Sequence, residues 1–185
     1  IKNEYGTKTQ NEVLLDMFYQ RDFIPSVWGK LYKQKLFSNE IRFEENRIFE
    51  DVELLPKIIE RANKIAFSDS ELYGYRHRNK RTTTSTFSDK DLDIIYICNL
   101  LEKKYIDSNI NKAVLSYSTN CAMRIWLTAP RTEKYKGIIS ESANKIKATS
   151  SDILKDKNVR KKLKIAIILF LYFRPFISFI HAHVN

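Results

Sequence analysis

The stretch IRFEENRIFEDVELLPKIIERANKIAF (41–67) decides most of what this sequence predicts. From Phe49 onward its apolar residues recur every three or four positions, which is the spacing of one buried face of an α-helix. These residues are Phe49, Val52, Leu55, Ile58, Ile59 and Ala62. Pro56 is tolerated only near a first turn, where its missing N–H would be unpaired, so we expect the regular helix to begin late. Glu50 and Asp51 are therefore expected at or just before the helix N-terminus.

Upstream of this stretch, residues 10–20 carry apolar side chains at helical spacing and predict an amphipathic helix. Pro25 ends that pattern. Residues 26–37 (SVWGKLYKQKLF) combine a short β-prone start with a helical continuation, and Gly29 marks the break. We expect a loop across 39–47.

Downstream, KIAFSD (64–69) and ELYGYRHR (71–78) are short runs of β-prone residues with a polar turn between them. They predict two strands or extended segments. Residues 79–88 are basic and rich in Thr and Ser, which predicts a loop. Three later segments have helical patterns, 108–127, 132–147 and 158–173, and Pro130 and Pro175 are expected to punctuate them.

A further helix is expected to follow Ser88, whose hydroxyl can cap it, and to run to about Lys104. Asp89, Asp91 and Asp93 lie in its opening turns and formally include a D-x-D pattern. At a helix start such acids interact favourably with the helix dipole and face solvent. No other ligand converges on them in sequence, so we do not expect a metal site there.

The composition favours a folded domain, because 43% apolar residues in a chain of 185 are enough to bury a core. The chain starts at Ile1 without a basic and apolar leader, which predicts a start inside a longer chain and no secretion. Cys98 and Cys121 lie in apolar, helix-patterned surroundings without paired-ligand spacing. We expect buried free thiols rather than a disulfide or a zinc site.

A formal net charge of +10 predicts an anionic partner, and its excess lies in two clusters, 76–81 (RHRNKR) and 155–164 (KDKNVRKKLK). Nucleic acid, acidic lipid headgroups and the diphosphate of a sugar donor all have that charge. The sequence contains no helix-turn-helix, zinc-finger or RNP-type aromatic signature, so nucleic acid is not the expected partner.

The tail is apolar at 165–173 (IAIILFLYF) and is interrupted at Arg174 and Pro175. A membrane-spanning helix needs about 20 predominantly apolar residues, so this run is too short and too broken. Because the basic cluster 155–164 precedes it, a helix lying in a membrane interface is one interpretation. A helix docked on the rest of the domain is an equally good one.

Three ordered segments, SVWGKLYKQKLF (26–37), the 41–67 stretch and LYGYRHRNKRTTTS (72–85), suggest a family. They resemble the W-G/N-K-L-Y, F-x-E-G/N-x-x-x-E-D and Y-x-Y-R-x-R segments of the second half of bacterial family 2 glycosyltransferases. The resemblance covers about residues 10–90. It implies the C-terminal, acceptor-side half of an α/β GT-A-type domain at 1–87, followed by a helical region.

The expected architecture is therefore mainly α with a few short β-strands. The helical region spans 88–185, and 155–181 is its membrane-associated part if the tail lies in an interface. The resemblance implies transfer of a sugar from a nucleotide-diphosphate donor to an acceptor hydroxyl, usually with inversion, in bacterial polysaccharide or glycoconjugate synthesis.

The resemblance also implies roles for particular residues. Asp51 corresponds to the general base near the acceptor, and Glu50 would help to hold that site. An acceptor hydroxyl is a poor nucleophile near neutral pH, so a carboxylate must take its proton as the new bond forms. Trp28 offers an apolar face on which a sugar ring can stack, and Lys30 is close enough in sequence to contact the acceptor.

Arg76, His77 and Arg78 correspond to the segment that faces the donor diphosphate, whose growing charge guanidinium groups stabilise. The family's D-x-D motif belongs to the first half of the domain. A divalent metal, Mg²⁺ or Mn²⁺, is therefore expected with ligands mainly outside this chain, which provides no metal site and is expected to be inactive alone. After the arginines, Arg81 and the threonines that follow replace a Ser-Ile-Thr-like stretch, so contacts from that loop differ from the family pattern.

The expected partners are a nucleotide-sugar donor and a sugar or lipid-linked acceptor, with no nucleic acid. The expected location is the cytoplasm. If the tail lies in an interface, the surface of an anionic membrane is a further partner and the location is the inner face of the cell membrane. A different class of function also fits the charge and the helices. In that alternative the chain is a non-catalytic, basic helical module or scaffold that binds nucleic acid or an anionic membrane.

Overall fold

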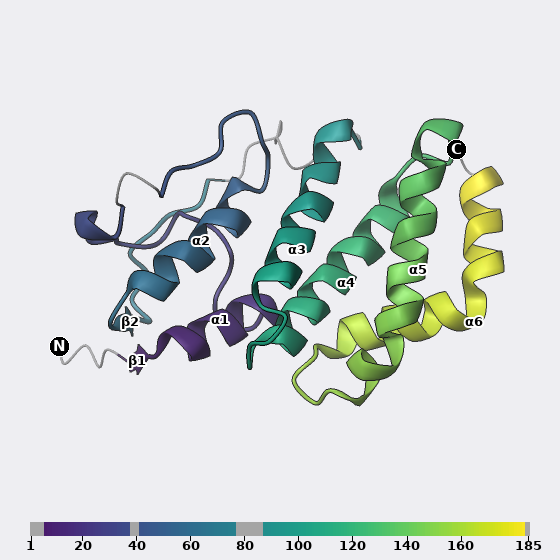
Figure 1. Cartoon of the computed structure of the whole chain (residues 1–185). Helices are drawn as coiled ribbons and strands as arrows, with labels where there is room; N and C mark the ends of the chain where they lie inside the picture. The colour runs from purple at the N-terminus through teal and green to yellow at the C-terminus, as the bar shows by residue number, and fades with distance from the viewer. Residues whose placement is uncertain (1–5, 38–40, 77–86, 184–185) are drawn as a thin grey trace. The chain divides into compact units, whose positions relative to one another are not determined.

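A computed structural model of the protein describes residues 6–37, 41–76 and 87–183, with side chains as far as Phe173. Within those residues the fold is mainly helical and contains a two-stranded antiparallel sheet (Figure 1). The predicted mainly α class is confirmed. The chain divides into two compact units, Ile1–Asp93 and Ile94–Asn185, which are described in turn.

The first unit places a short antiparallel sheet beside two helices. Strand β1 (Gly6–Lys8) pairs with β2 (Ile65–Phe67) so that Thr7 lies opposite Ala66. The predicted strand at 64–69 is thus confirmed at its centre, whereas residues 71–76 are exposed and have no regular structure. The remaining positions of that second predicted strand, 77 and 78, lie outside the described residues. The elements of this unit are β1 (Gly6–Lys8), α1 (Gln10–Phe18), the 3₁₀ turn η1 (Gln34–Leu36), α2 (Glu50–Arg61), β2 (Ile65–Phe67) and the 3₁₀ turn η3 (Asp89–Leu92).

Helix α1 starts with a capping box, in which the Thr9 side chain accepts from the Glu12 N–H and the Glu12 carboxylate accepts from the Thr9 N–H. The apolar positions on which the prediction rested are buried: Val13, Leu14, Met17 and Phe18. The helix ends before the predicted residue 20, because Gln20 adopts a left-handed backbone with φ of 54°.

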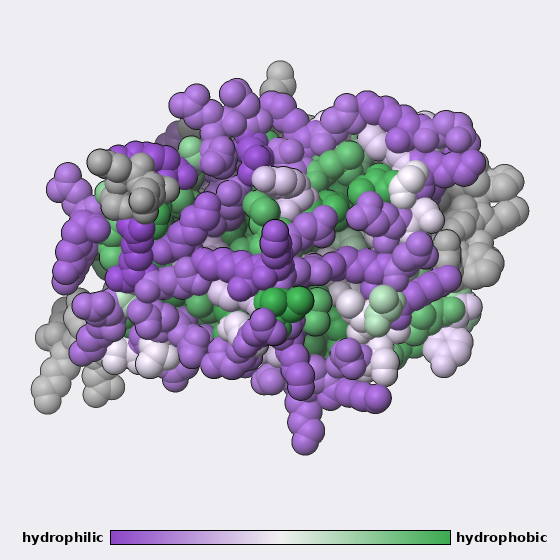
Figure 2. Space-filling model, in the orientation of Figure 1, coloured by the Kyte–Doolittle hydropathy of each residue, from purple (hydrophilic) through white to green (hydrophobic). Residues whose placement is uncertain are grey.

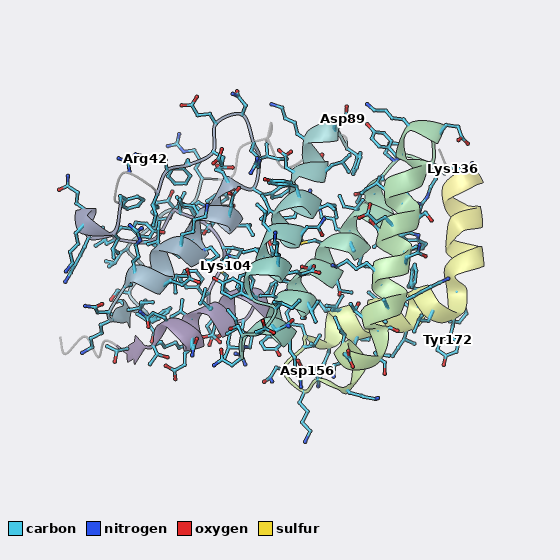
Figure 3. All side chains as sticks on the ribbon, viewed as in Figure 1. Arg42, Asp89, Lys104, Lys136, Asp156 and Tyr172 are labelled. Atoms are coloured by element: carbon cyan, nitrogen blue, oxygen red, sulfur yellow. The ribbon has the colours of Figure 1, made fainter. Side chains whose placement is uncertain are left out.

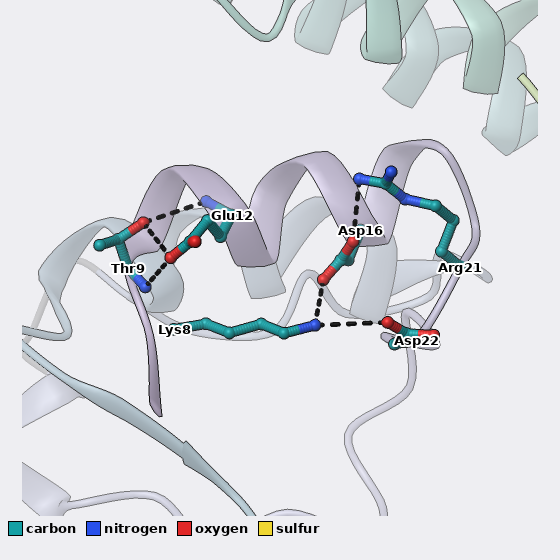
Figure 4. Close-up of polar contacts among 6 residues, drawn as sticks. All are labelled: Lys8, Thr9, Glu12, Asp16, Arg21 and Asp22. Atoms are coloured by element: carbon teal, nitrogen blue, oxygen red, sulfur yellow. Dashed lines mark hydrogen bonds and ion pairs between the residues drawn. The ribbon is translucent and has the colours of Figure 1, made fainter. Parts of the chain in front are cut away.

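A buried carboxylate ties α1 to its surroundings (Figure 4). Asp16 Oδ2 lies 2.6 Å from Lys8 Nζ, and Asp16 Oδ1 lies 2.9 Å from Arg21 Nη2. Lys8 Nζ also reaches Asp22 at 3.4 Å. The hydrogen bond to Asp16 raises the pKa of Lys8 above its ordinary value. Because a buried charge without partners would be costly, this network holds β1, α1 and the turn after α1 together.

Helix α2 begins at Glu50, as predicted, but the expectation of a late regular start near Pro56 is wrong. Pro56 is buried inside the helix, well past its first turn. Its missing N–H removes one hydrogen bond, and the apolar neighbours Leu54, Leu55 and Ile58 are all buried. Burial of this face outweighs the lost bond, so the helix continues through the proline.

The predicted mixed segment 26–37 contains one 3₁₀ turn, η1, and no strand. Tyr32, Leu36 and Phe37 pack against a buried cluster of Ile41, Leu54 and Ile58. The segment therefore covers α2 through side-chain packing instead of pairing in a sheet. Gly29 has φ of +69°, which places the expected backbone break at this residue.

The second unit is built from helices, which are α3 (Asp93–Lys104, whose first residue closes the first unit), α4 (Asn111–Thr128), α5 (Glu133–Lys155) and α6 (Lys161–His183). The predicted cap at Ser88 is confirmed as a capping box with Asp91 in the turn that leads into α3. Pro130 separates α4 from α5 as predicted. Helix α5 continues beyond the predicted end at 147, because Ile153 is buried and extends its apolar face.

Pro175 lies inside α6 and does not end it, contrary to prediction. Figure 1 shows that α6 bends sharply along its length. Proline inside a helix is a common cause of such a bend, because its ring clashes with the preceding turn. No helix in the described part of the chain is long and apolar enough to cross a membrane.

The core of the second unit centres on Trp126, which is 1% exposed. Its ring meets Phe170 of α6 edge to face, with centroids 4.8 Å apart. Thr119 and Thr149 share a hydrogen bond of 2.9 Å between α4 and α5. Cys98 and Cys121 are buried and free, which confirms their prediction. On the face shown in Figure 2, hydrophilic residues predominate and apolar residues show in smaller areas between them.

Trp126→Ala should lower the free energy of unfolding by about 3 to 5 kcal/mol, because it removes a buried aromatic side chain and leaves a cavity beneath Phe170. Urea unfolding followed by circular dichroism measures this change. The adjacent Leu127 is 38% exposed, so Leu127→Ala is the matched control and should change stability much less. Equal effects of the two substitutions would contradict this description of the core.

Candidate functional site

The candidate site starts at the first turn of α2, where Glu50 and Asp51 follow a left-handed residue. Phe49 has φ of 63° and ψ of 22°, a conformation that costs a bulky residue about 1 to 2 kcal/mol. The Val52 N–H is shared between the Phe49 carbonyl oxygen at 3.0 Å and Asp51 Oδ1 at 2.8 Å. The carboxylate of Asp51 therefore accepts a backbone N–H in the first turn of the helix, two residues after the strained Phe49.

Two contacts hold the loop before this turn in place. Asp93 Oδ2 accepts the Ile48 N–H at 3.0 Å across 45 positions of sequence. The buried carboxylate of Glu53 accepts from Arg47 Nη1 at 2.6 Å and from Lys57 Nζ at 3.2 Å. These bonds fix the backbone on both sides of the strained residue, which is how such a conformation persists.

Asp51 is partly buried and lies within electrostatic range of Lys30 and Tyr32. Burial raises the pKa of Asp51 above its ordinary value, and the charge of Glu50 adds to the rise. The Val52 N–H and the positive charge of Lys30 act in the opposite direction. The pKa of Tyr32 is raised to about 12, first by burial and then by the charge of Asp51.

Lys30 is held by the main chain of its own loop. Its Nζ donates to the carbonyl oxygens of Ser26 at 2.7 Å and Ile24 at 3.1 Å, and it lies 4.6 Å from the centroid of the Phe23 ring. Burial lowers the pKa of Lys30, while Asp51 raises it. In this arrangement the ammonium orders the loop and supplies positive charge to Asp51. Its predicted contact with an acceptor stays a prediction.

Trp28 lies in an aromatic cluster that the sequence did not indicate. Its ring stacks on Tyr73 with centroids 5.6 Å apart and planes at 17°, and it meets Tyr75 at 5.0 Å. Trp28 is 41% exposed, and both tyrosines are more than half exposed. Exposed aromatic rings gathered in this way offer the apolar surface on which sugar rings stack. The spacing of two between the tyrosines was the available signal, because it places both side chains on one side of an extended segment.

Among the residues predicted for the donor side, Arg76 is exposed and directly follows Tyr75 of the aromatic cluster. His77 and Arg78 lie outside the described residues, as does most of the predicted loop 79–88. Of the predicted site residues, Asp51 and Lys30 are therefore close enough for each charge to affect the pKa of the other. Trp28 contacts Tyr75, and the arginine segment is described only at its first residue, Arg76.

The aspartates after Ser88 serve the fold. Asp91 accepts from the Ser88 N–H at 2.9 Å in the capping box, as expected of an acid at a helix start. Asp93 departs from the prediction that it faces solvent, because its carboxylate binds the Ile48 N–H. Throughout the described residues, no group of three or more His, Cys, Asp or Glu side chains could hold a metal ion.

Comparisons of this chain with protein-family models, with curated proteins and with solved structures find no match. The resemblance to family 2 glycosyltransferases therefore stays a prediction that rests on the three quoted segments. The geometry around Asp51 and Trp28 supplies independent observations about the same residues.

Lys30→Met should raise the pKa of Asp51 further, because it removes the positive charge that favours the carboxylate. A carboxyl-carbon NMR titration of the wild type and the variant measures this change. Since the pKa of folded Asp51 lies above that of the unfolded chain, protonation of Asp51 stabilises the fold. That contribution is fully present below the ordinary aspartate pKa and is lost as pH rises through the raised value. An unchanged Asp51 titration in the variant would contradict the proximity of these two charges.

Asp93→Ala should lower the free energy of unfolding by about 1 to 3 kcal/mol and speed hydrogen exchange at the Ile48 amide, because that partly buried donor loses its acceptor. Asp93→Asn is the matched variant, since its side-chain oxygen can still accept this bond. Exchange at Ile48 should stay close to wild type in the Asn variant, and equally fast exchange in both variants would show that the bond does not hold the loop.

Proposed function

We propose that this chain forms the acceptor side of a glycosyltransferase of the GT-A type and that Asp51 is its general base. The observation that carries the proposal is the environment of Asp51. Its carboxylate is partly buried at a strained helix start, has a raised pKa and lies within the field of Lys30. Strained backbone and perturbed carboxylates gather at functional sites, and the three sequence segments suggest which function this is.

In the proposed reaction, Asp51 accepts the proton of the acceptor hydroxyl while the oxygen of that hydroxyl attacks the anomeric carbon of the donor sugar. The bond between that carbon and the nucleoside diphosphate breaks, and the diphosphate leaves with the electron pair on the opposite face. Inversion follows from this single displacement. A raised pKa makes the carboxylate a stronger base, and the positive charge of Lys30 favours its ionised form.

The aromatic cluster of Trp28, Tyr73 and Tyr75 is the proposed platform for the acceptor sugar. One member of this cluster, Trp28, lies in the same loop as Lys30 and is two positions before it in the chain. Arg76, with His77 and Arg78, is proposed to face the donor diphosphate. A divalent metal bound by residues mainly outside this chain is proposed to supply further charge stabilisation.

Asp51→Asn should lower the rate of sugar transfer by about 10²- to 10⁴-fold, because it removes the proton acceptor. The measurement is turnover with a labelled nucleotide-sugar in the polypeptide that joins this chain to its donor-binding half. Donor affinity should be unchanged. The exposed carboxylate of Glu44 provides the control, and Glu44→Gln should leave turnover as it is.

Two further results separate the parts of the proposal. Trp28→Ala should raise the KM for the acceptor more than it lowers kcat, since the ring is proposed to bind and not to transfer a proton. Turnover of Asp51→Asn at the wild-type rate would reject Asp51 as the base. Loss of donor binding in Asp51→Asn would instead show that the residue supports the fold of the site.

A further inference from the structure

Helix α6 has two apolar faces, and the fold buries only one of them. Leu163, Ile167 and Phe170 point into the second unit and are at most 4% exposed. Phe170 contacts the ring of Trp126 there. This face is committed to the protein core.

The opposite face of α6 carries a second stripe at positions i, i+3, i+4 and i+7. At 3.6 residues per turn these positions share one side of the helix, turned away from Leu163, Ile167 and Phe170. Their exposed fractions are 57% for Ile165, 43% for Ile168, 46% for Leu169 and 76% for Tyr172. Figure 3 shows Tyr172 projecting outward from α6. Exposed apolar residues are ordinary when scattered, but a contiguous stripe marks an interaction site.

Basic side chains gather at the N-terminal end of this stripe. Those that are exposed are Lys155, Lys157, Arg160, Lys161 and Lys162. Lys161 lies one turn before Ile165 and therefore on the same side of the helix as the stripe. A binding partner of this face of α6 must therefore accept apolar side chains and carry negative charge beside them.

We infer that the outer face of α6, formed by Ile165, Ile168, Leu169 and Tyr172, binds the surface of an anionic membrane. The helix would lie in the interface, with its apolar stripe among the acyl chains near the headgroups and its lysines at the anionic phosphates. It does not span the bilayer, because its other face is buried against Trp126. This inference does not depend on the proposed catalysis.

The charge argues against a second copy of the chain as the occupant. Two copies packed through the stripe would bury its apolar side chains but would give the basic side chains at its end no negative charge to bind. An anionic membrane supplies both the apolar and the anionic contact. Nucleic acid would match the lysines but would leave the apolar stripe exposed.

The test is flotation of the full chain with phosphatidylcholine vesicles in which roughly one lipid in three is phosphatidylglycerol. The chain should float with these vesicles, bind pure phosphatidylcholine weakly, and release as salt is added. Ile168→Ser with Leu169→Ser should weaken binding by more than about tenfold, because the apolar contact is lost. Ser140→Thr with Ser151→Thr, at exposed positions of α5, is the control and should bind like wild type.

A second pair of variants tests the charge. Lys161→Gln with Lys162→Gln should weaken binding by about 25-fold, from about fivefold for each basic side chain near an anionic surface. Lys112→Gln with Lys147→Gln removes the same charge from exposed positions outside the cluster and should weaken binding much less. Circular dichroism checks that every variant keeps its helical content.

Three results would overturn the inference. The first is a chain that stays unbound to the anionic vesicles. The second is stripe variants that bind as well as wild type, since charge alone would then account for adsorption. The third is a dimer in light scattering that the stripe substitutions dissociate while vesicles bind nothing, which would identify the outer face of α6 as a contact between copies.

Discussion

The left-handed backbone of Phe49 is the constraint on which the candidate site depends. An aromatic residue held there costs about 1 to 2 kcal/mol, so the contacts of its neighbours must stabilise the loop by more than this strain energy. Asp93 does so at the Ile48 N–H, and Glu53 does so through Arg47. The direction in which α2 begins, and with it the place of Asp51, follows from these bonds.

Burial around that helix start couples the charges of the site. The same withdrawal from water that raises the pKa of Asp51 lowers the pKa of Lys30, and each charge partly restores the ionised form of the other. Lys30 also fastens the loop that carries Trp28. A carboxylate of raised pKa, a cation and an aromatic surface are the three features that the proposed sugar transfer would use.

Local patterns in the sequence were sufficient for most helices. Most of the periodic apolar residues of 10–20 and 49–62 are buried, because period and burial are linked within a single helix. The cap at Ser88 was equally predictable, since its partner Asp91 is three residues away. Pro56 shows where such local rules stop, because a buried apolar face kept the helix intact around it.

The sequence by itself therefore determined where most helices form, that the cysteines are buried, and which carboxylate stands at the start of α2. Only the tertiary structure decided that β1 pairs with β2, that Asp93 holds the loop at Ile48, and that Tyr73 and Tyr75 gather on Trp28. The physical reason is the separation along the chain over which each kind of interaction acts. Caps and helical periods act over a few residues, whereas strand partners, loop clamps and ring contacts join positions that only the folded chain brings together.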